Sequence, residues 1–85
     1  MSDHPTSFKG SVPDAIRTAI VDKIPDAKVE VQGGGGHYTI DVVSTVFAGL
    51  GRVDAQRLVY GAISALMAGS DAPVHAVDTL RVKTP

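Results

Sequence analysis

The chain has 85 residues, a formal net charge of −1 at pH 7, 44% hydrophobic residues and no cysteine. This length fits one globular domain, and the lack of thiols excludes disulfides and thiolate metal sites within the chain. The near-neutral charge excludes a general attraction to nucleic acid or anionic membranes, and no apolar run reaches the roughly 18–20 residues that span a bilayer. We therefore expect a cytoplasmic protein with no membrane contact.

The N-terminal part of the chain divides into a tail and the start of a helix. Residues 1–10 are polar, which predicts a flexible tail ahead of a single domain over residues 11–85. A helix should begin at this boundary, because Ser11 can cap it and Pro13 suits its first turn. Apolar residues then recur at helical spacing until Pro25 ends the helix.

Two stretches of alternating residues follow the helix. Apolar and polar residues alternate over residues 27–32 and again over residues 37–42, which predicts two strands joined as a hairpin. The residues between them are Gly33, Gly34, Gly35 and Gly36. Because a tight hairpin turn needs only two residues, four glycines predict a long and mobile loop.

The rest of the chain predicts two helical segments and a third strand. A short helical turn is expected over residues 44–47, a longer helix from Arg52 to Gly69, and a strand over residues 74–83. The alternation in this strand changes parity around Asp78-Thr79, which indicates a bulge. The order α-β-β-α-α-β, with a parallel crossover into the last strand, predicts an α+β fold with a three-stranded mixed sheet and helices on one face.

Two histidines are candidate metal ligands. His37 begins the second strand and His75 lies at the start of the third, so their side chains could approach at one end of the sheet. Either histidine alone is more typical of a solvated or hydrogen-bonded structural residue. Imidazole suits zinc, copper and iron, but two imidazoles cannot complete a closed site, so a partner would have to supply the remaining ligands.

No arrangement of residues indicates catalysis, and we expect no enzymatic activity. The glycine run lacks the lysine and hydroxyl residue of a P-loop and joins strand to strand. Ser44 is better explained as a helix cap, and Asp41 as a polar group at a strand edge. A modest basic patch for a partner or for nucleic acid could form from Arg52, Arg57, Arg81 and Lys83. Because aspartates dilute these cations, a solvated surface is the simpler interpretation.

Five short motifs share their order and spacing with a known protein family. They are Val42-Val43-Ser44, Phe47-Ala48-Gly49, Arg57-Leu58-Val59-Tyr60, Val74-His75-Ala76-Val77 and Thr84-Pro85. With these motifs the chain, from about residue 13 to residue 85, resembles the BolA-like family, in particular its short IbaG-type branch. The resemblance implies a type II KH-like fold, in agreement with the order of elements above. The last strand is one residue longer than in close relatives, which fits the expected bulge.

The resemblance also implies a partner and a shared cofactor. BolA-like proteins pair with monothiol glutaredoxins that carry a CGFS active site, and a 2Fe–2S cluster is shared between the two. A glutaredoxin cysteine and a glutathione thiol supply ligands from one side. By resemblance, His75 supplies a ligand from this chain and His37 a second one, with residues 33–36 letting His37 reach the cluster. The isolated chain would hold no cofactor.

Two functions follow from this resemblance. The first is a non-enzymatic adaptor in iron–sulfur trafficking or iron regulation. The alternative is a transcriptional regulator that binds DNA through the KH-like fold. The segment Asp54-Ala55-Gln56 stands where the family helix often carries basic residues, and this favours the adaptor.

Overall fold

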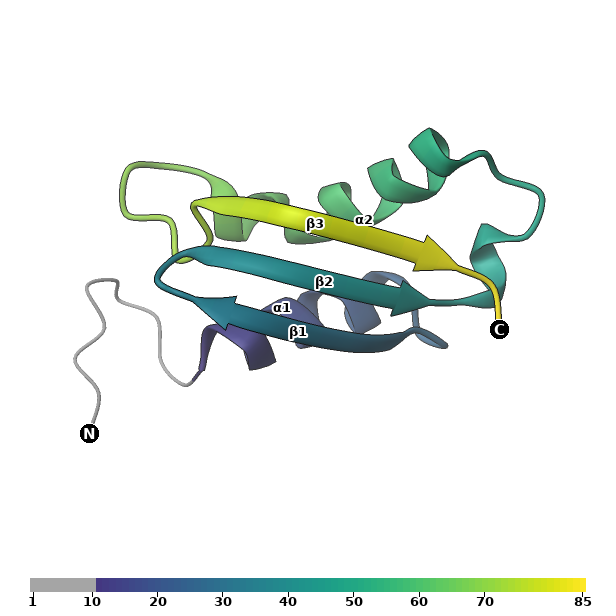
Figure 1. The fold of residues 1–85 in the computed structure, drawn as a ribbon, viewed down its shortest axis with the longest axis horizontal. Helices are drawn as coiled ribbons and strands as arrows, with labels where there is room; N and C mark the ends of the chain where they lie inside the picture. Colours follow the sequence, from purple (N-terminus) through teal and green to yellow (C-terminus); the bar gives the residue numbers. More distant parts are fainter. Residues whose placement is uncertain (1–10) are drawn as a thin grey trace.

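The computed structural model describes residues 11–85, so the predicted tail over residues 1–10 lies outside the described residues. Within them the chain forms α1 (Val12–Lys23), β1 (Lys28–Gly34), β2 (His37–Val43), η1 (Thr45–Phe47), α2 (Arg52–Met67) and β3 (Ala76–Lys83). The central strand β2 pairs antiparallel with β1 and parallel with β3, and both helices pack on one face of this sheet (Figure 1). The predicted α+β fold with a mixed three-stranded sheet is confirmed.

The first helix begins and ends as its sequence predicts. The Ser11 side chain accepts a hydrogen bond from the backbone N–H of Asp14 at 3.0 Å, which satisfies one of the free donors of the first turn. At the other end, the N–H of Ile24 donates to the carbonyl of Ile20 at 2.8 Å, just before Pro25. These two ends limit the helix to Val12–Lys23, and its buried residues Ile16 and Ile20 belong to the core.

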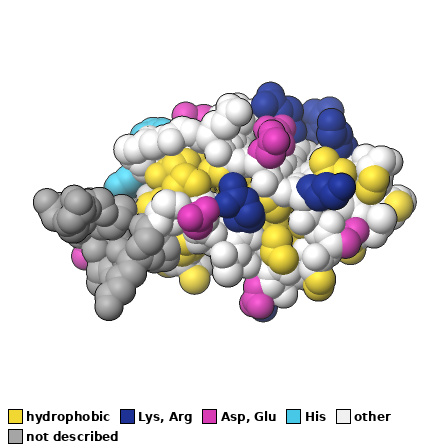
Figure 2. Space-filling view, turned by 90° about the horizontal axis from the view of Figure 1, so that it is seen from below, with side chains coloured by type: hydrophobic (Ala, Val, Ile, Leu, Met, Phe, Trp, Pro, Cys, Tyr) yellow, Lys and Arg dark blue, Asp and Glu magenta, His cyan; other side chains and the backbone are white. Residues whose placement is uncertain are grey.

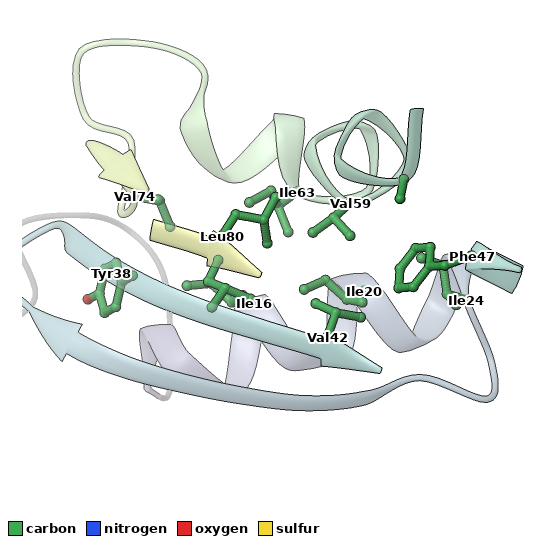
Figure 3. Close-up of a cluster of buried hydrophobic side chains, with 12 residues drawn as sticks. Ile16, Ile20, Ile24, Tyr38, Val42, Phe47, Val59, Ile63, Val74 and Leu80 are labelled. Atoms are coloured by element: carbon green, nitrogen blue, oxygen red, sulfur yellow. The ribbon is translucent and has the colours of Figure 1, made fainter. Parts of the chain in front are cut away.

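In the described part of the chain, one apolar core lies between the helices and the sheet (Figure 3). Alternate residues of β2 are buried, and the buried positions of both helices are spaced by four residues. The fully buried side chains of the core include Ile16, Ile20, Ile40, Val42, Val59, Ile63 and Val74. The opposite face of the sheet has no helix on it within the described residues, and it carries the polar residues of the strands.

The connection between β1 and β2 is shorter than the sequence predicts. Gly34 pairs with His37, so Gly35 and Gly36 alone form the turn. Their φ angles of +63° and +89° match a two-residue type I′ hairpin, which favours glycine at both positions. Gly33 belongs to β1 and has a φ of +122°. The prediction of a long loop over residues 33–36 is therefore wrong. Gly33 and Gly34 continue β1, but glycines have no side chains whose alternation would reveal a strand in the sequence.

The predicted bulge in the third strand is confirmed. Tyr38 pairs with Val77 and Thr39 pairs with Thr79, so Asp78 has no partner in the β2–β3 ladder. This extra residue restores the apolar parity, since the side chains of β3 before and after it can then both face the helices.

The predicted helical turn after β2 is a single 3-10 turn, η1. Ser44 caps it by accepting a hydrogen bond from Val46 N–H at 3.1 Å, as expected from the sequence. The Ser44 hydroxyl in turn donates to the Asp26 carboxylate at 2.5 Å, and Thr45 donates to the same carboxylate from its backbone and its hydroxyl. These bonds, that from Ser44 above all, lower the pKa of Asp26 to about 2.

Within residues 11–85 no helix is both long enough and apolar enough to cross a membrane.

Candidate functional site

The start of β3 is attached to the β1–β2 turn by two backbone hydrogen bonds. The N–H groups of His75 and Ala76 both donate to the carbonyl oxygen of Gly36, at 2.8 and 2.9 Å. In the β2–β3 ladder His37 pairs with Ala76. The backbones of His37 and His75 therefore lie side by side at one end of the sheet, as the parallel crossover predicts.

The His75 side chain is exposed and packs against the turn. Its Cδ2 occupies the space into which a Cβ on Gly36 would project, and Gly36 itself is buried. His75 also lines a pocket of about 540 Å³. The walls of this pocket are the hairpin glycines, Tyr38, the first residues of α1 and the loop over residues 70–73. An imidazole in this position can meet a ligand or a partner without any rearrangement of the core.

The His37 side chain lies on the open face of the sheet, because its neighbour Tyr38 is buried on the helix face. Its Nδ1 atom is 3.1 Å from Oδ1 of Asp78, the bulge residue, and 59% of the His37 side chain is exposed. His37 does not line the pocket that His75 lines. Within residues 11–85 no three His, Cys, Asp or Glu side chains gather as a metal site. The backbones of the two histidines therefore lie close together, but their side chains lie on different sides of the turn.

Figure 2 shows where these residues reach the surface. Two areas of histidine surface (cyan) lie at the left end of the molecule, the end at which Figure 1 shows the β1–β2 turn. Lysine and arginine side chains (dark blue) lie over the middle and right of the same view, with acidic side chains (magenta) between them. The histidine end and the basic residues are thus separate surfaces.

The family of the chain is decided by comparison with known proteins. Residues 14–85 match the family model described as BolA-like protein. The chain belongs to the BolA-like family. It is 31% identical over 70 residues to the acid stress protein IbaG of Escherichia coli strain K12, a match that covers 82% of this chain and 80% of that protein.

Solved BolA structures share the fold of this BolA-like chain. A bolA protein homologue from Coxiella burnetii superposes with a TM-score of 0.72 at 27% identity, over 89% of this chain and 94% of the other. BolA1 from Arabidopsis thaliana gives a TM-score of 0.74 over 91% of this chain and 95% of the other, and its 20% identity supports the fold alone. The resemblance to the BolA-like family and the predicted α+β fold are both confirmed.

The four basic candidates of this BolA-like chain do not form one patch. Arg52 and Lys83 line a second groove of about 520 Å³ beside η1. Arg57 lies 3.8 Å from Asp54, an acidic residue one turn earlier in α2. Arg81, on the open face of the sheet, forms an ion pair of its own with an acidic residue of β2. Two of the four cations are therefore paired with carboxylates.

Asp41 is part of one of these pairs, and its predicted place at a strand edge is wrong. It lies on the central strand β2, where Arg81 donates to its two oxygens from Nε at 2.6 Å and from Nη2 at 3.3 Å. Hydrogen bonding to Arg81 lowers the pKa of Asp41, and the same contact raises the pKa of Arg81. The sequence could not show this pair because its members are 40 positions apart.

The nucleic-acid motif of KH domains is not matched between the two helical elements of this BolA-like chain. KH domains clamp nucleic acid with a GXXG loop. Here the loop between η1 and α2 contains Gly49-Leu50-Gly51, with its glycines two positions apart instead of three. Gln56, in the segment Asp54-Ala55-Gln56, donates from Nε2 to the carbonyl of Leu80 at 3.0 Å. That side chain binds β3 and is not presented to a nucleic acid.

Sequence reasoning missed Asp78 as a neighbour of His37. The change of parity around Asp78-Thr79 indicated the bulge but not what the bulged side chain contacts. The signal was present in the combination of a bulge near the start of β3 and a histidine at the start of the parallel strand β2. Only the register places the two residues on one face.

Proposed function

We propose that this BolA-like chain is a non-enzymatic adaptor that binds a monothiol CGFS glutaredoxin. In the complex the chain contributes imidazole ligands to a shared 2Fe–2S cluster, with His75 as the first ligand and His37 as the second. This role would serve iron–sulfur trafficking or iron regulation. The observation that supports it best is the exposed His75 imidazole, which is anchored by its own backbone to the β1–β2 turn beside His37.

The donor atoms of the chain fit a shared cluster better than a resident one. The chain has no cysteine, and within residues 11–85 no three potential ligands gather. Histidine can replace cysteine on one iron of a 2Fe–2S cluster, as in Rieske centres. Two imidazoles from this chain and two thiolates, from the glutaredoxin and from glutathione, would complete four ligands. A partner is then required for binding, as expected of an adaptor.

The surroundings of His75 suit a ligand that meets a partner. The backbone N–H groups of His75 and of its neighbour Ala76 donate to the Gly36 carbonyl, and the absence of a Cβ at Gly36 leaves room for the His75 ring. A ligand whose backbone is fixed loses less conformational entropy on binding than one in a long loop. This corrects the role expected for the glycines: they form a tight turn that positions the histidines.

The experiment is reconstitution of the complex. The chain is mixed with a CGFS glutaredoxin, iron, sulfide and glutathione, and the visible circular dichroism spectrum is compared with that of the glutaredoxin homodimer alone. The wild-type chain should give a new spectrum. His75→Ala should abolish it, and His37→Ala should shift it or shorten the lifetime of the cluster.

A matched control separates ligand loss from damage to the strand. Thr79→Ala changes an exposed side chain on the same strand as the bulge and should leave the heterodimer spectrum unchanged. Far-ultraviolet circular dichroism of each free variant checks that it is folded. If the spectrum of the mixture remains that of the glutaredoxin homodimer, or if folded His75→Ala gives the wild-type spectrum, the proposed ligation is wrong.

A further inference from the structure

We infer that Asp78 is a positioning residue for His37: its carboxylate holds the proton of the neutral imidazole on Nδ1 and leaves the Nε2 lone pair free to bind a metal. The metal-binding part of this inference rests on the proposed function. The tautomer itself is a property of the free chain and can be tested without a cluster.

The bulge in β3 creates this contact. On either side of the bulge the ladder is regular, with Tyr38 opposite Val77 and Thr39 opposite Thr79. Asp78 is the one residue between these pairs that has no partner on β2, and its side chain lies beside His37 on the open face. The strand therefore contains one extra residue, and that residue carries the carboxylate that reaches the imidazole.

The contact is not a by-product of core packing. The side chains of His37 and Asp78 are 59% and 57% exposed, and their atoms Nδ1 and Oδ1 lie 3.1 Å apart. Two exposed side chains separated by 41 positions meet only because the register brings their strands together. Buried polar groups must form hydrogen bonds within the protein because water cannot reach them, but His37 and Asp78 are exposed and could bind water instead.

The chemistry of the two groups determines the position of the proton. An ionised carboxylate only accepts hydrogen bonds, so a contact at hydrogen-bond distance requires Nδ1 to carry the hydrogen. A neutral imidazole has one N–H, and Nε2 is then the atom with the lone pair. Metal-bound histidines commonly donate their other ring N–H to a carboxylate, which fixes the tautomer and the direction of the ring.

The first test measures the tautomer of His37 in the free chain. Long-range ¹H–¹⁵N spectra, which distinguish the two neutral tautomers from the charged ring, are recorded at about pH 8, and His37→Ala assigns the signals of His37. The wild type should show His37 protonated at Nδ1. Asp78→Ala should move the signals toward the Nε2-protonated form, and Asp78→Asn, which keeps an acceptor oxygen, should restore part of the wild-type pattern.

Glu30→Ala is the matched control, because it removes another exposed carboxylate from β1 of the same sheet. It should leave the His37 signals unchanged. If Asp78→Ala also leaves them unchanged, or if wild-type His37 is protonated at Nε2, the positioning role of Asp78 is overturned.

The second test uses the heterodimer with a CGFS glutaredoxin. Outer-shell partners of metal-bound histidines typically contribute about 10–100-fold to metal affinity, so Asp78→Ala should lose the cluster faster by a factor in this range, and Glu30→Ala should not. A changed tautomer with an unchanged cluster lifetime would overturn the metal-binding part alone. Failure of the wild type to form any heterodimer cluster would refute the proposed function, and the tautomer result would be unaffected.

Discussion

The ring of His75 occupies the space that a side chain on Gly36 would need, and the Gly36 carbonyl accepts the His75 N–H at 2.8 Å. One glycine thus fixes both the backbone and the side chain of the first proposed ligand. The same glycine has a φ of +89°, in the left-handed region that other residues rarely adopt. Gly36 therefore contributes both to the turn, together with Gly35, and to the position of the proposed ligand.

Substitution of Gly36 should disturb both the turn and the position of His75. Gly36→Ala should destabilise the chain by about 1–3 kcal/mol, because it adds left-handed strain and a collision with the His75 ring. It should also displace His75, seen as a shift of its imidazole signals by NMR. Urea denaturation gives the free energy of unfolding.

Gly34→Ala is the control within the same run. A Cβ there would meet no atom within 4 Å, and the φ of Gly34 is not positive. This variant should be neutral or more stable by roughly 0.5–1 kcal/mol, since alanine restricts the unfolded chain. Equal loss of stability in both variants would show that neither the left-handed φ of Gly36 nor its contact with His75 determines the requirement for glycine.

Shortening a buried side chain of the core should lower the stability of the fold. Ile20 is fully buried between α1 and the sheet, and Ile20→Ala should lower the free energy of unfolding by about 2–5 kcal/mol through lost burial and a residual cavity. Val53→Ala on α2 is the control, because 61% of Val53 is exposed and its loss should change stability by less than about 0.5 kcal/mol. Similar effects of the two changes in urea denaturation would contradict the packing described above.

Asp26 should make the free energy of unfolding depend on pH in the acidic range. Its folded pKa of about 2 lies below the ordinary value of 3.8, so the folded state binds the proton less readily than the unfolded state. The stabilisation by the carboxylate is complete above about pH 4 and decreases as the pH falls toward about 2. Urea denaturation between these pH values should show wild type losing stability relative to Asp26→Asn, which cannot ionise.

Ser44→Ala tests the physical cause of that pKa. Hydrogen bonding from Ser44 is the largest contribution to the low value, so this variant should raise the pKa of Asp26. The lost cap of η1 should also reduce stability by about 1 kcal/mol at neutral pH. An Asp26 pKa that stays at its wild-type value, followed by carboxyl-carbon NMR, would exclude Ser44 as the cause.

Binding to nucleic acid should be weak. Arg57 and Arg81 each pair with an aspartate, which leaves Arg52 and Lys83 beside one groove as the other two basic candidates. Fluorescence anisotropy with single-stranded DNA at about 0.15 M salt should give no saturable binding. Tight binding that weakens steeply with salt and is lost in Arg52→Ala would support the transcriptional regulator instead.

The order of the elements, the β3 bulge and the family followed from the sequence alone. Helical spacing, strand alternation and a break in parity are properties of neighbouring residues, so they are visible along one chain. The family motifs and the two histidines at the starts of parallel strands were visible for the same reason.

Only the tertiary structure decided which side chains meet. Strand register placed Asp78 beside His37 and Arg81 beside Asp41, and chain folding brought Asp26 to Ser44. Backbone pairing through two glycines shortened the hairpin turn to Gly35 and Gly36. The physical reason is the same in each case: hydrogen bonds between distant segments depend on how strands align, and glycines have no side chains whose alternation would show that alignment.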